Sequence, residues 1–223
     1  MLLSHVHKFI YLKTVKTGGT SVEIYFEPCC KDPESRGEVP HNRDQEVSKW
    51  GIIGSRGRPF QGQTWYNHMT AASVLALIGP QMWRDYYKFC VVRHPYDKAV
   101  SLFWHQLSQG HRAELKYAPF AAVRTAFEEW LKDAELPADR KIYSIGDHPV
   151  VNRFVRYESL LSGLAEVCHD LHIAWDASRL GYYKADTRVR PEPFSDYYRA
   201  SSARRVSEVY RWDFEYFQYA TGL

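Results

Sequence analysis

The chain has 223 residues, 45% of them hydrophobic and 15% aromatic, so it is long enough and apolar enough to bury one substantial core. Its 29 basic and 26 acidic side chains give a formal net charge of +3, which excludes a polycation and gives no support to nucleic-acid binding. The first residues lack the apolar stretch of a signal peptide, and no segment reaches the length of a membrane span. We therefore expect a cytoplasmic protein with a single domain over residues 1–223, whose four cysteines are thiols.

The hydrophobic pattern predicts strands that alternate with helices along the chain. Strands are expected at 9–12, 87–92 and 152–157, and helices at 22–26, 70–78, 96–109, 120–131, 160–171 and 201–219. Gly79 and Pro80 are predicted to end the second of these helices, and Pro95 to begin the third. The region of about 31–63 is rich in proline, glycine and charge, so we expect a long functional loop there. This order predicts a P-loop-like three-layer α/β fold, with a central parallel sheet flanked by helices.

A polar segment with two glycines, Lys13 to Ser21, follows the first predicted strand and enters the first predicted helix. Backbone N–H groups and the positive end of a helix converge at such a junction on a space of the size of an anion. Glycines allow the backbone to approach the ligand, a lysine adds a mobile positive charge, and hydroxyls add donors. The residues predicted to bind a phosphate-like group are Lys16, Thr17, Gly18, Gly19, Thr20 and Ser21.

The order of residues in this segment differs from that of a Walker A loop. A Walker A lysine follows the last glycine, whereas Lys16 precedes Gly18 and Gly19. A polar turn between a strand and a helix, in which a serine or threonine only caps the helix, is the alternative interpretation.

A second candidate anion site follows the predicted strand at 87–92. Arg93 comes at the end of that strand, and Ser101 lies about two turns into the next helix. A guanidinium and a hydroxyl together suit a terminal phosphate. Two separate anion sites are what a nucleotide with phosphates at both its 5′ and 3′ ends needs.

Taken in this order, the two motifs resemble those of sulfotransferases that use 3′-phosphoadenosine 5′-phosphosulfate (PAPS), more the carbohydrate and bacterial enzymes than the small-phenol enzymes. The resemblance implies that 16–21 is the 5′-phosphosulfate loop and that Arg93 with Ser101 is the 3′-phosphate site. The tail at 210–217 is similar to the aromatic and acidic ending of many members, and we expect it to pack in the core. The chain departs from the commonest loop at Val15, where a proline usually stands.

The resemblance also implies a catalytic histidine upstream of Arg93, and among ten histidines we choose His68. An ordinary polar role for His68 at a helix start is the alternative, and His94, which we interpret as structural, is its main rival. The late segment Asp186-Thr187-Arg188 resembles a loop that closes over the nucleotide. Arg188 is accordingly predicted to contact the 3′-phosphate, with an exposed run of charge as the alternative.

The residues around His68 could form a surface for the acceptor. Aromatic rings stack on sugars and arginines hold anions. The residues with these properties are Trp65 and Tyr66 together with Arg43, Arg56 and Arg58. A solvated loop with one anchoring tryptophan is the alternative.

The hypothesis is therefore a sulfotransferase without a metal, in which Lys16 neutralises the bridging oxygen and His68 deprotonates the acceptor hydroxyl. A sugar hydroxyl on a polysaccharide or glycoconjugate is the first expectation for the acceptor, with a small natural product or lipid alcohol second. Two alternatives stay open: a P-loop nucleotide kinase or phosphotransferase, and a non-catalytic module that binds a nucleotide or a glycan.

Overall fold

The computed structural model describes residues 1–34, 39–57, 62–181, 183 and 187–222, and the chain divides into two compact units. Met1–Val92 and Asp139–Tyr183 form the first, which we call the sheet unit. Arg93–Ala138 and Lys184–Leu223 form the second, which we call the helical unit. The expectation of a single domain stays a prediction, and the two units are described separately.

A six-stranded mixed sheet lies at the centre of the sheet unit. Its strands, in the order β3-β4-β1-β2-β5-β8, are Glu46–Val47, Gly51–Ile53, Leu2–Ser4, Phe9–Tyr11, Tyr87–Val92 and Arg153–Arg156. β2, β5 and β8 are parallel neighbours, whereas β1 is antiparallel to both β2 and β4, and β3 is antiparallel to β4. The α/β class is confirmed; the predicted central parallel sheet is found only for β2, β5 and β8, because β1, β3 and β4 make the sheet mixed. Only four residues join β1 to β2, and so short a connection permits antiparallel pairing alone.

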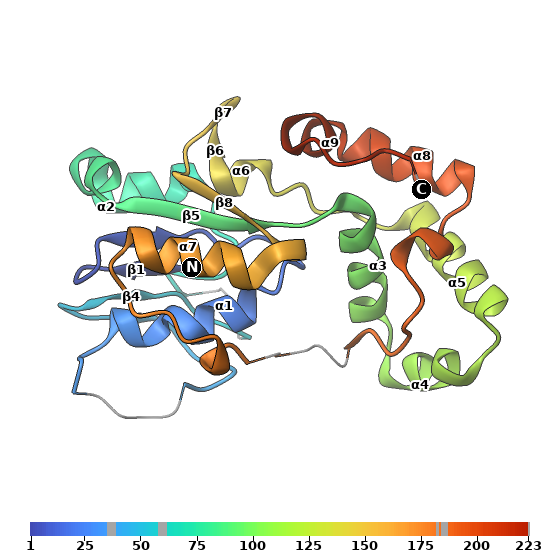
Figure 1. Cartoon of the computed structure of the whole chain (residues 1–223), viewed down its shortest axis with the longest axis horizontal. Helices are drawn as coiled ribbons and strands as arrows, with labels where there is room; N and C mark the ends of the chain where they lie inside the picture. The colour runs from blue at the N-terminus through green and yellow to red at the C-terminus, as the bar shows by residue number, and fades with distance from the viewer. Residues whose placement is uncertain (35–38, 58–61, 182, 184–186, 223) are drawn as a thin grey trace. The chain divides into compact units, whose positions relative to one another are not determined.

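Helices lie on both sides of β5 in the sheet unit. Figure 1 shows α1 (Gly19–Phe26) and α7 (Leu160–Asp170) on one side, and α2 (Ala71–Asp85) and α6 (Arg140–Tyr143) on the other. The core under α1 and α7 joins strand residues such as Phe9 and Phe89 to helix residues such as Phe26, Leu164 and Val167. The unit also contains a hairpin and 3₁₀ turns, namely β6 (Ser144–Ile145), β7 (His148–Pro149), η1 (Glu27–Cys30), η2 (Tyr157–Ser159) and η3 (Ala177–Arg179).

The helix α2 continues past the point where the sequence predicted its end. Gly79 has non-helical torsion angles (φ 80°, ψ 163°), so the helix is kinked there, and a second helical segment runs to Asp85. Proline is well suited to the first turn of a helix because its missing N–H would be unpaired there in any case. Pro80 therefore starts this second segment, and the predicted stop is a kink.

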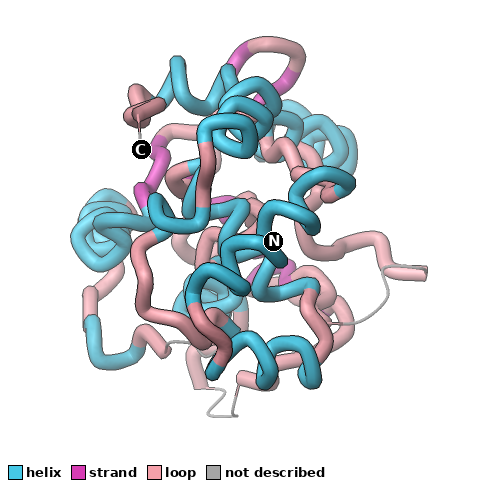
Figure 2. The backbone as a smooth tube through the Cα atoms, turned by 90° about the vertical axis from the view of Figure 1, so that its right-hand side faces the viewer, coloured by secondary structure: helices cyan, strands magenta, loops and turns pink. Residues whose placement is uncertain are grey.

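The helical unit consists of helices around an aromatic core, and the chain as a whole contains more helix than strand (Figure 2). Its elements are α3 (Pro95–Gln106), α4 (Gln109–Tyr117), α5 (Phe120–Asp133), η5 (Phe194–Tyr197), α8 (Ala200–Val209) and α9 (Arg211–Phe217). Tyr210, Phe214 and Phe217 are buried, which confirms that the tail packs in a core. The predicted helix at 96–109 ends earlier, because the Ser108 hydroxyl caps a new helix by accepting a hydrogen bond from the His111 N–H (3.2 Å). No helix among the described residues is long and apolar enough to cross a membrane.

The two strands that precede the predicted anion sites end at the same edge of the sheet. β2 and β5 are parallel, with Tyr11 opposite Phe89, and the Leu12 N–H donates to the Phe89 carbonyl (3.0 Å). Ligands of open α/β sheets bind beyond the carboxyl ends of such strands. The loop after β2 is therefore well placed for a ligand, and the chain leaves β5 at this edge as well.

Candidate anion-binding and catalytic site

The segment Lys13–Ser21, here called the anion loop, has an unusual backbone. Lys16 (φ 60°) and Gly18 (φ 73°) both lie in the left-handed region. This conformation costs a lysine free energy, and such costs are found most often where a function requires them. His68, the other predicted catalytic residue, also has a positive φ of 63°.

Hydrogen bonds from distant parts of the chain hold the anion loop in shape. The Thr14 hydroxyl, which is buried, donates to the Val91 carbonyl of β5 and lies 2.7 Å from the Thr17 hydroxyl. The Val15 N–H donates to both carboxylate oxygens of Asp139, at 3.1 and 3.2 Å. The hydroxyls of Thr14 and Thr17 therefore build the loop itself, and Asp139 fixes it at Val15.

The start of α1 presents unpaired donors. Among the described residues, the N–H groups of Gly18, Gly19 and Thr20 have no hydrogen-bond partner. No side chain caps the helix, and its first turn contains no acidic residue that could take the place of an anion. The Ser21 hydroxyl accepts a hydrogen bond from the Tyr183 N–H (3.2 Å). Unpaired N–H groups at the positive end of a helix are suited to an anion such as a phosphate or sulfate group.

Gly19 is required by the close contact between the anion loop and β2. A Cβ atom at this position would lie 2.8 Å from Lys13 Cγ and 3.2 Å from the Tyr11 hydroxyl oxygen. Lys13 is buried and ion-paired, so its side chain has little room to move. Gly19→Ala should therefore lower the free energy of unfolding by about 1–3 kcal/mol, measured by urea denaturation.

Gly110→Ala is the matched control for this change. Gly110 lies within α4, and the nearest atom to an added Cβ is the Ser108 hydroxyl oxygen at 4.0 Å. Because alanine favours helix more than glycine does, we expect a gain of about 0.5–1 kcal/mol. Equal stability of Gly19→Ala and the unmodified chain would contradict the close contact described here.

The His68 ring is hydrogen-bonded to the first residue of the anion loop. Its Nδ1 lies 3.1 Å from the Lys13 carbonyl oxygen, and because a carbonyl only accepts, Nδ1 carries the proton. Desolvation, with the Lys13 ammonium and the Met1 amino group nearby, lowers the pKa of His68 to about 4. The residue is also exposed, so water screens part of this effect, and the downward direction of the shift suffices to keep the ring neutral at neutral pH. At neutral pH the ring is therefore neutral, and Nε2 can accept a proton.

In the helical unit, the Asp97 carboxylate binds both arginines that are predicted to contact the 3′-phosphate. Asp97 Oδ2 accepts hydrogen bonds from Arg93 at 2.7 Å, and Asp97 Oδ1 accepts one from Arg188 at 2.9 Å. Ser101 follows Asp97 by one helical turn on α3 and so lies on the same face. Arg93, Arg188 and Asp97 therefore form one cluster, while Asp186 of the predicted late loop lies outside the described residues.

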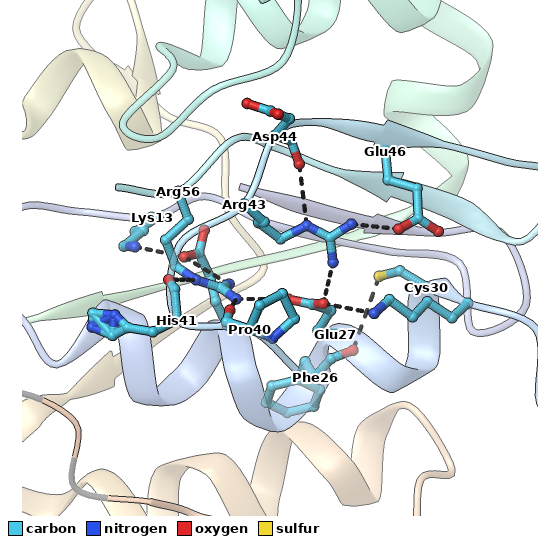
Figure 3. A network of polar contacts seen from close by, with 12 residues as sticks. Lys13, Phe26, Glu27, Cys30, Pro40, His41, Arg43, Asp44, Glu46 and Arg56 are labelled. Carbon is cyan, nitrogen blue, oxygen red and sulfur yellow. Dashed lines mark hydrogen bonds and ion pairs between the residues drawn. The ribbon is translucent and has the colours of Figure 1, made fainter. Parts of the chain in front are cut away.

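The residues suggested as an acceptor surface are mostly engaged in the interior. Figure 3 shows Arg43 and Arg56 directed at the buried carboxylate of Glu27, and Trp65 is 8% exposed. These positions favour the alternative of a loop anchored by one tryptophan, and Arg58 lies outside the described residues.

The predicted site residues thus fall into two groups in the structure. His68 and the anion loop with Lys16 come together in the sheet unit, and Arg93, Arg188 and Ser101 belong to the helical unit. Comparison of the chain with protein-family models, curated proteins and solved structures found no match. The prediction that one nucleotide contacts both groups stays a prediction.

Sequence reasoning missed Asp139 and Glu23. Asp139 lies 124 residues from its partner Val15, and no local pattern indicates such a pairing. Glu23 had a signal: it is a charged residue within the apolar run 22–26, where burial requires a charged partner.

Proposed function

We propose that the chain is a PAPS-dependent sulfotransferase that moves a sulfuryl group to an acceptor hydroxyl. The acceptor oxygen forms a bond to sulfur while the bond between sulfur and the bridging 5′-phosphate oxygen breaks. His68 Nε2 takes the acceptor proton, and Lys16 neutralises the charge on the departing oxygen of adenosine 3′,5′-bisphosphate. Arg93, Ser101 and Arg188 bind the 3′-phosphate. The proposed fold is P-loop-like, with β2, the anion loop and α1 as its phosphate-binding part.

The hydrogen bond between His68 and the Lys13 carbonyl carries this proposal. It brings a neutral imidazole to the start of the loop that holds Lys16. A group that accepts a proton and a group that stabilises a leaving anion are the two functions that sulfuryl transfer needs from side chains. The unpaired N–H groups at Gly18, Gly19 and Thr20 support an anionic ligand at the same loop.

The acceptor and the compartment are part of the same proposal. We propose a sugar hydroxyl on a polysaccharide or glycoconjugate, following the resemblance to carbohydrate sulfotransferases. All four cysteines are unpaired thiols, which suits the reducing cytoplasm. Incubation of an acceptor library with PAPS, followed by mass spectrometry, identifies the acceptor by the mass of the added sulfuryl group.

Thermal unfolding in the presence of nucleotides separates this function from its rivals. Adenosine 3′,5′-bisphosphate at about a hundred times its dissociation constant should stabilise the chain by about 2.7 kcal/mol, whereas ATP with magnesium should have little effect. Arg93→Ala should lose most of the stabilisation by the bisphosphate but respond to adenosine 5′-phosphosulfate as the unmodified chain does, because that ligand lacks a 3′-phosphate.

Arg112→Ala serves as the control for Arg93→Ala. Arg112 also lies in the helical unit, where it donates to the carbonyls of Trp104 and Leu107. This variant should keep the full response to the bisphosphate. Stabilisation by ATP with magnesium and not by the bisphosphate would instead favour a phosphotransferase, and equal responses of Arg93→Ala and Arg112→Ala would contradict the 3′-phosphate site.

A further inference from the structure

The buried carboxylate of Glu23 connects the two parts of the candidate catalytic site in the sheet unit. Glu23 lies on α1 and is 1% exposed. Its Oε2 lies 2.5 Å from Lys13 Nζ, the side chain of the first residue of the anion loop. One atom of the Asn67 amide lies 3.1 Å from Glu23 Oε1 and 3.2 Å from the Ser55 carbonyl oxygen; because both of these are acceptors, we assign that atom as the nitrogen, which donates to both. Asn67 directly precedes His68 in the chain.

Two further positive groups surround this carboxylate. The Met1 amino nitrogen lies 2.8 Å from Glu23 Oε1, and Arg56 Nη1 lies 3.6 Å from Glu23 Oε2. Burial by itself would raise the pKa of Glu23, but the Lys13 ammonium and the Met1 amino group outweigh it and lower this pKa to about 2, so that the carboxylate is charged at neutral pH. A buried carboxylate is stable only while its partners surround it. Glu23 therefore restricts the positions of the groups that pair with it.

A second buried carboxylate on the same helix provides an internal comparison. Glu27, one turn after Glu23, is fully buried and pairs with Arg43, Arg56 and Lys31 (Figure 3). Among the described residues, its hydrogen bonds and ion pairs are with Arg43 and Arg56 and with Lys31 directly after η1, and they include neither Lys13 nor Asn67. Both residues are therefore buried carboxylates on neighbouring turns. Of the two, only Glu23 contacts Lys13 of the anion loop and Asn67, the residue before His68.

We propose that Glu23 is a positioning residue, which holds the anion loop through Lys13 and the His68 backbone through Asn67 in one arrangement. The catalytic meaning of this arrangement rests on the proposed function. The arrangement itself requires only that Glu23 bind both segments. His68 Nδ1 bonds to the Lys13 carbonyl while the Lys13 ammonium bonds to Glu23, so a displaced Lys13 would displace both the loop and the imidazole.

Glu23→Gln tests the proposal, with Glu27→Gln as the matched control. Removing a negative charge near an anion site would by itself strengthen anion binding, whereas loss of a positioning residue weakens it. We expect Glu23→Gln to bind adenosine 3′,5′-bisphosphate about tenfold more weakly by calorimetry, and Glu27→Gln to bind it as the unmodified chain does. Equal or tighter binding by folded Glu23→Gln, or equal weakening in Glu27→Gln, would overturn the proposal.

The titration of the His68 ring, followed by NMR, gives a second readout that does not depend on turnover. The charged groups that face this ring are the Lys13 ammonium, the Met1 amino group and the Glu23 carboxylate. Glu23→Gln should therefore lower the pKa of His68 further, and Lys13→Met should raise it. Glu27→Gln should leave it unchanged, and an unchanged pKa in both Glu23→Gln and Lys13→Met would contradict the proposal.

Two variants keep the test valid if Glu23→Gln does not fold. Asn67→Ala removes one of the two connections and Lys13→Met the other, and each should weaken binding of the bisphosphate as Glu23→Gln does. Normal binding by both would refute the positioning role. If the chain binds the bisphosphate in this pattern but transfers no sulfuryl group to any acceptor, the proposed function fails while the role of Glu23 stands.

Discussion

Lys16→Ala is expected to lower kcat for sulfuryl transfer by about 100-fold to 1000-fold, the usual effect of removing a group that stabilises a developing anion. Lys16 lies on the anion loop between β2 and α1, beside the Gly18 and Gly19 N–H groups, which have no hydrogen-bond partner in the described part of the chain. In the proposed reaction, its charge would follow the bridging oxygen as the bond to sulfur breaks. Single-turnover measurements with PAPS and a saturating acceptor report this step directly.

Lys8→Ala is the matched control for this change. Lys8 is also a lysine with a positive φ (49°), but it is exposed in the turn between β1 and β2. The two variants lose the same side chain from the same backbone conformation, so comparing their denaturation curves separates a loss of stability from a loss of catalysis. Lys8→Ala should keep normal turnover, and a Lys16→Ala variant with a near-normal rate would remove Lys16 from the mechanism.

His68→Gln is expected to lower kcat/KM by about 100-fold to 10,000-fold, because the acceptor proton then has no base to receive it. In the unmodified chain, kcat/KM should be constant near neutral pH. It should fall only at acidic pH, as the His68 ring becomes protonated around its lowered pKa of about 4. The low-pH decrease should be absent from the residual activity of His68→Gln.

The pH dependence of stability follows the same pKa. Since the pKa of His68 in the folded chain lies below the value of 6.5 for a free side chain, the unfolded chain binds more protons between about 4 and 6.5. This contribution to stability is present above that window and is lost as pH falls through it. His172→Gln is the control for both measurements, because His172 is exposed and also has a positive φ, of 55°. Loss of activity in both variants alike would contradict a specific role for His68.

The parts of the fold that could be predicted from the sequence have strong local signals. β5 contains the apolar run Phe89–Val92, and α3 begins at Pro95, the proline that the sequence predicts to start it. β1 and β4 have only three residues each, too few to show a period. Short connections account for the pairs β1–β2 and β3–β4, whereas β1 and β4 are far apart in the chain and only the fold brings them together. The local sequence does not distinguish the kink at Gly79 from the end of the helix, because a proline after a glycine can also begin a new helical segment.

The candidate site divides in the same way. Lys16 and the glycines belong to one short segment between a strand and a helix, so local sequence indicated them. His68 is predicted only from its position upstream of Arg93. Its hydrogen bond to Lys13 joins residues 55 positions apart, which no local pattern indicates. Asp139 and Glu23 hold the loop through tertiary contacts, and only the fold brings Asp139 to Val15 or Asn67 to Glu23.

The proposed function requires one nucleotide to contact Lys16 with its 5′-phosphate and Arg93 with its 3′-phosphate. Phosphorus-31 NMR of adenosine 3′,5′-bisphosphate measures this directly, because each phosphate has its own resonance. Binding to the unmodified chain should shift both resonances, Lys16→Ala should reduce the shift of the 5′-phosphate, and Arg93→Ala should reduce that of the 3′-phosphate. If binding shifts one resonance alone, or if either substitution affects both equally, the two residues do not bind opposite ends of one ligand.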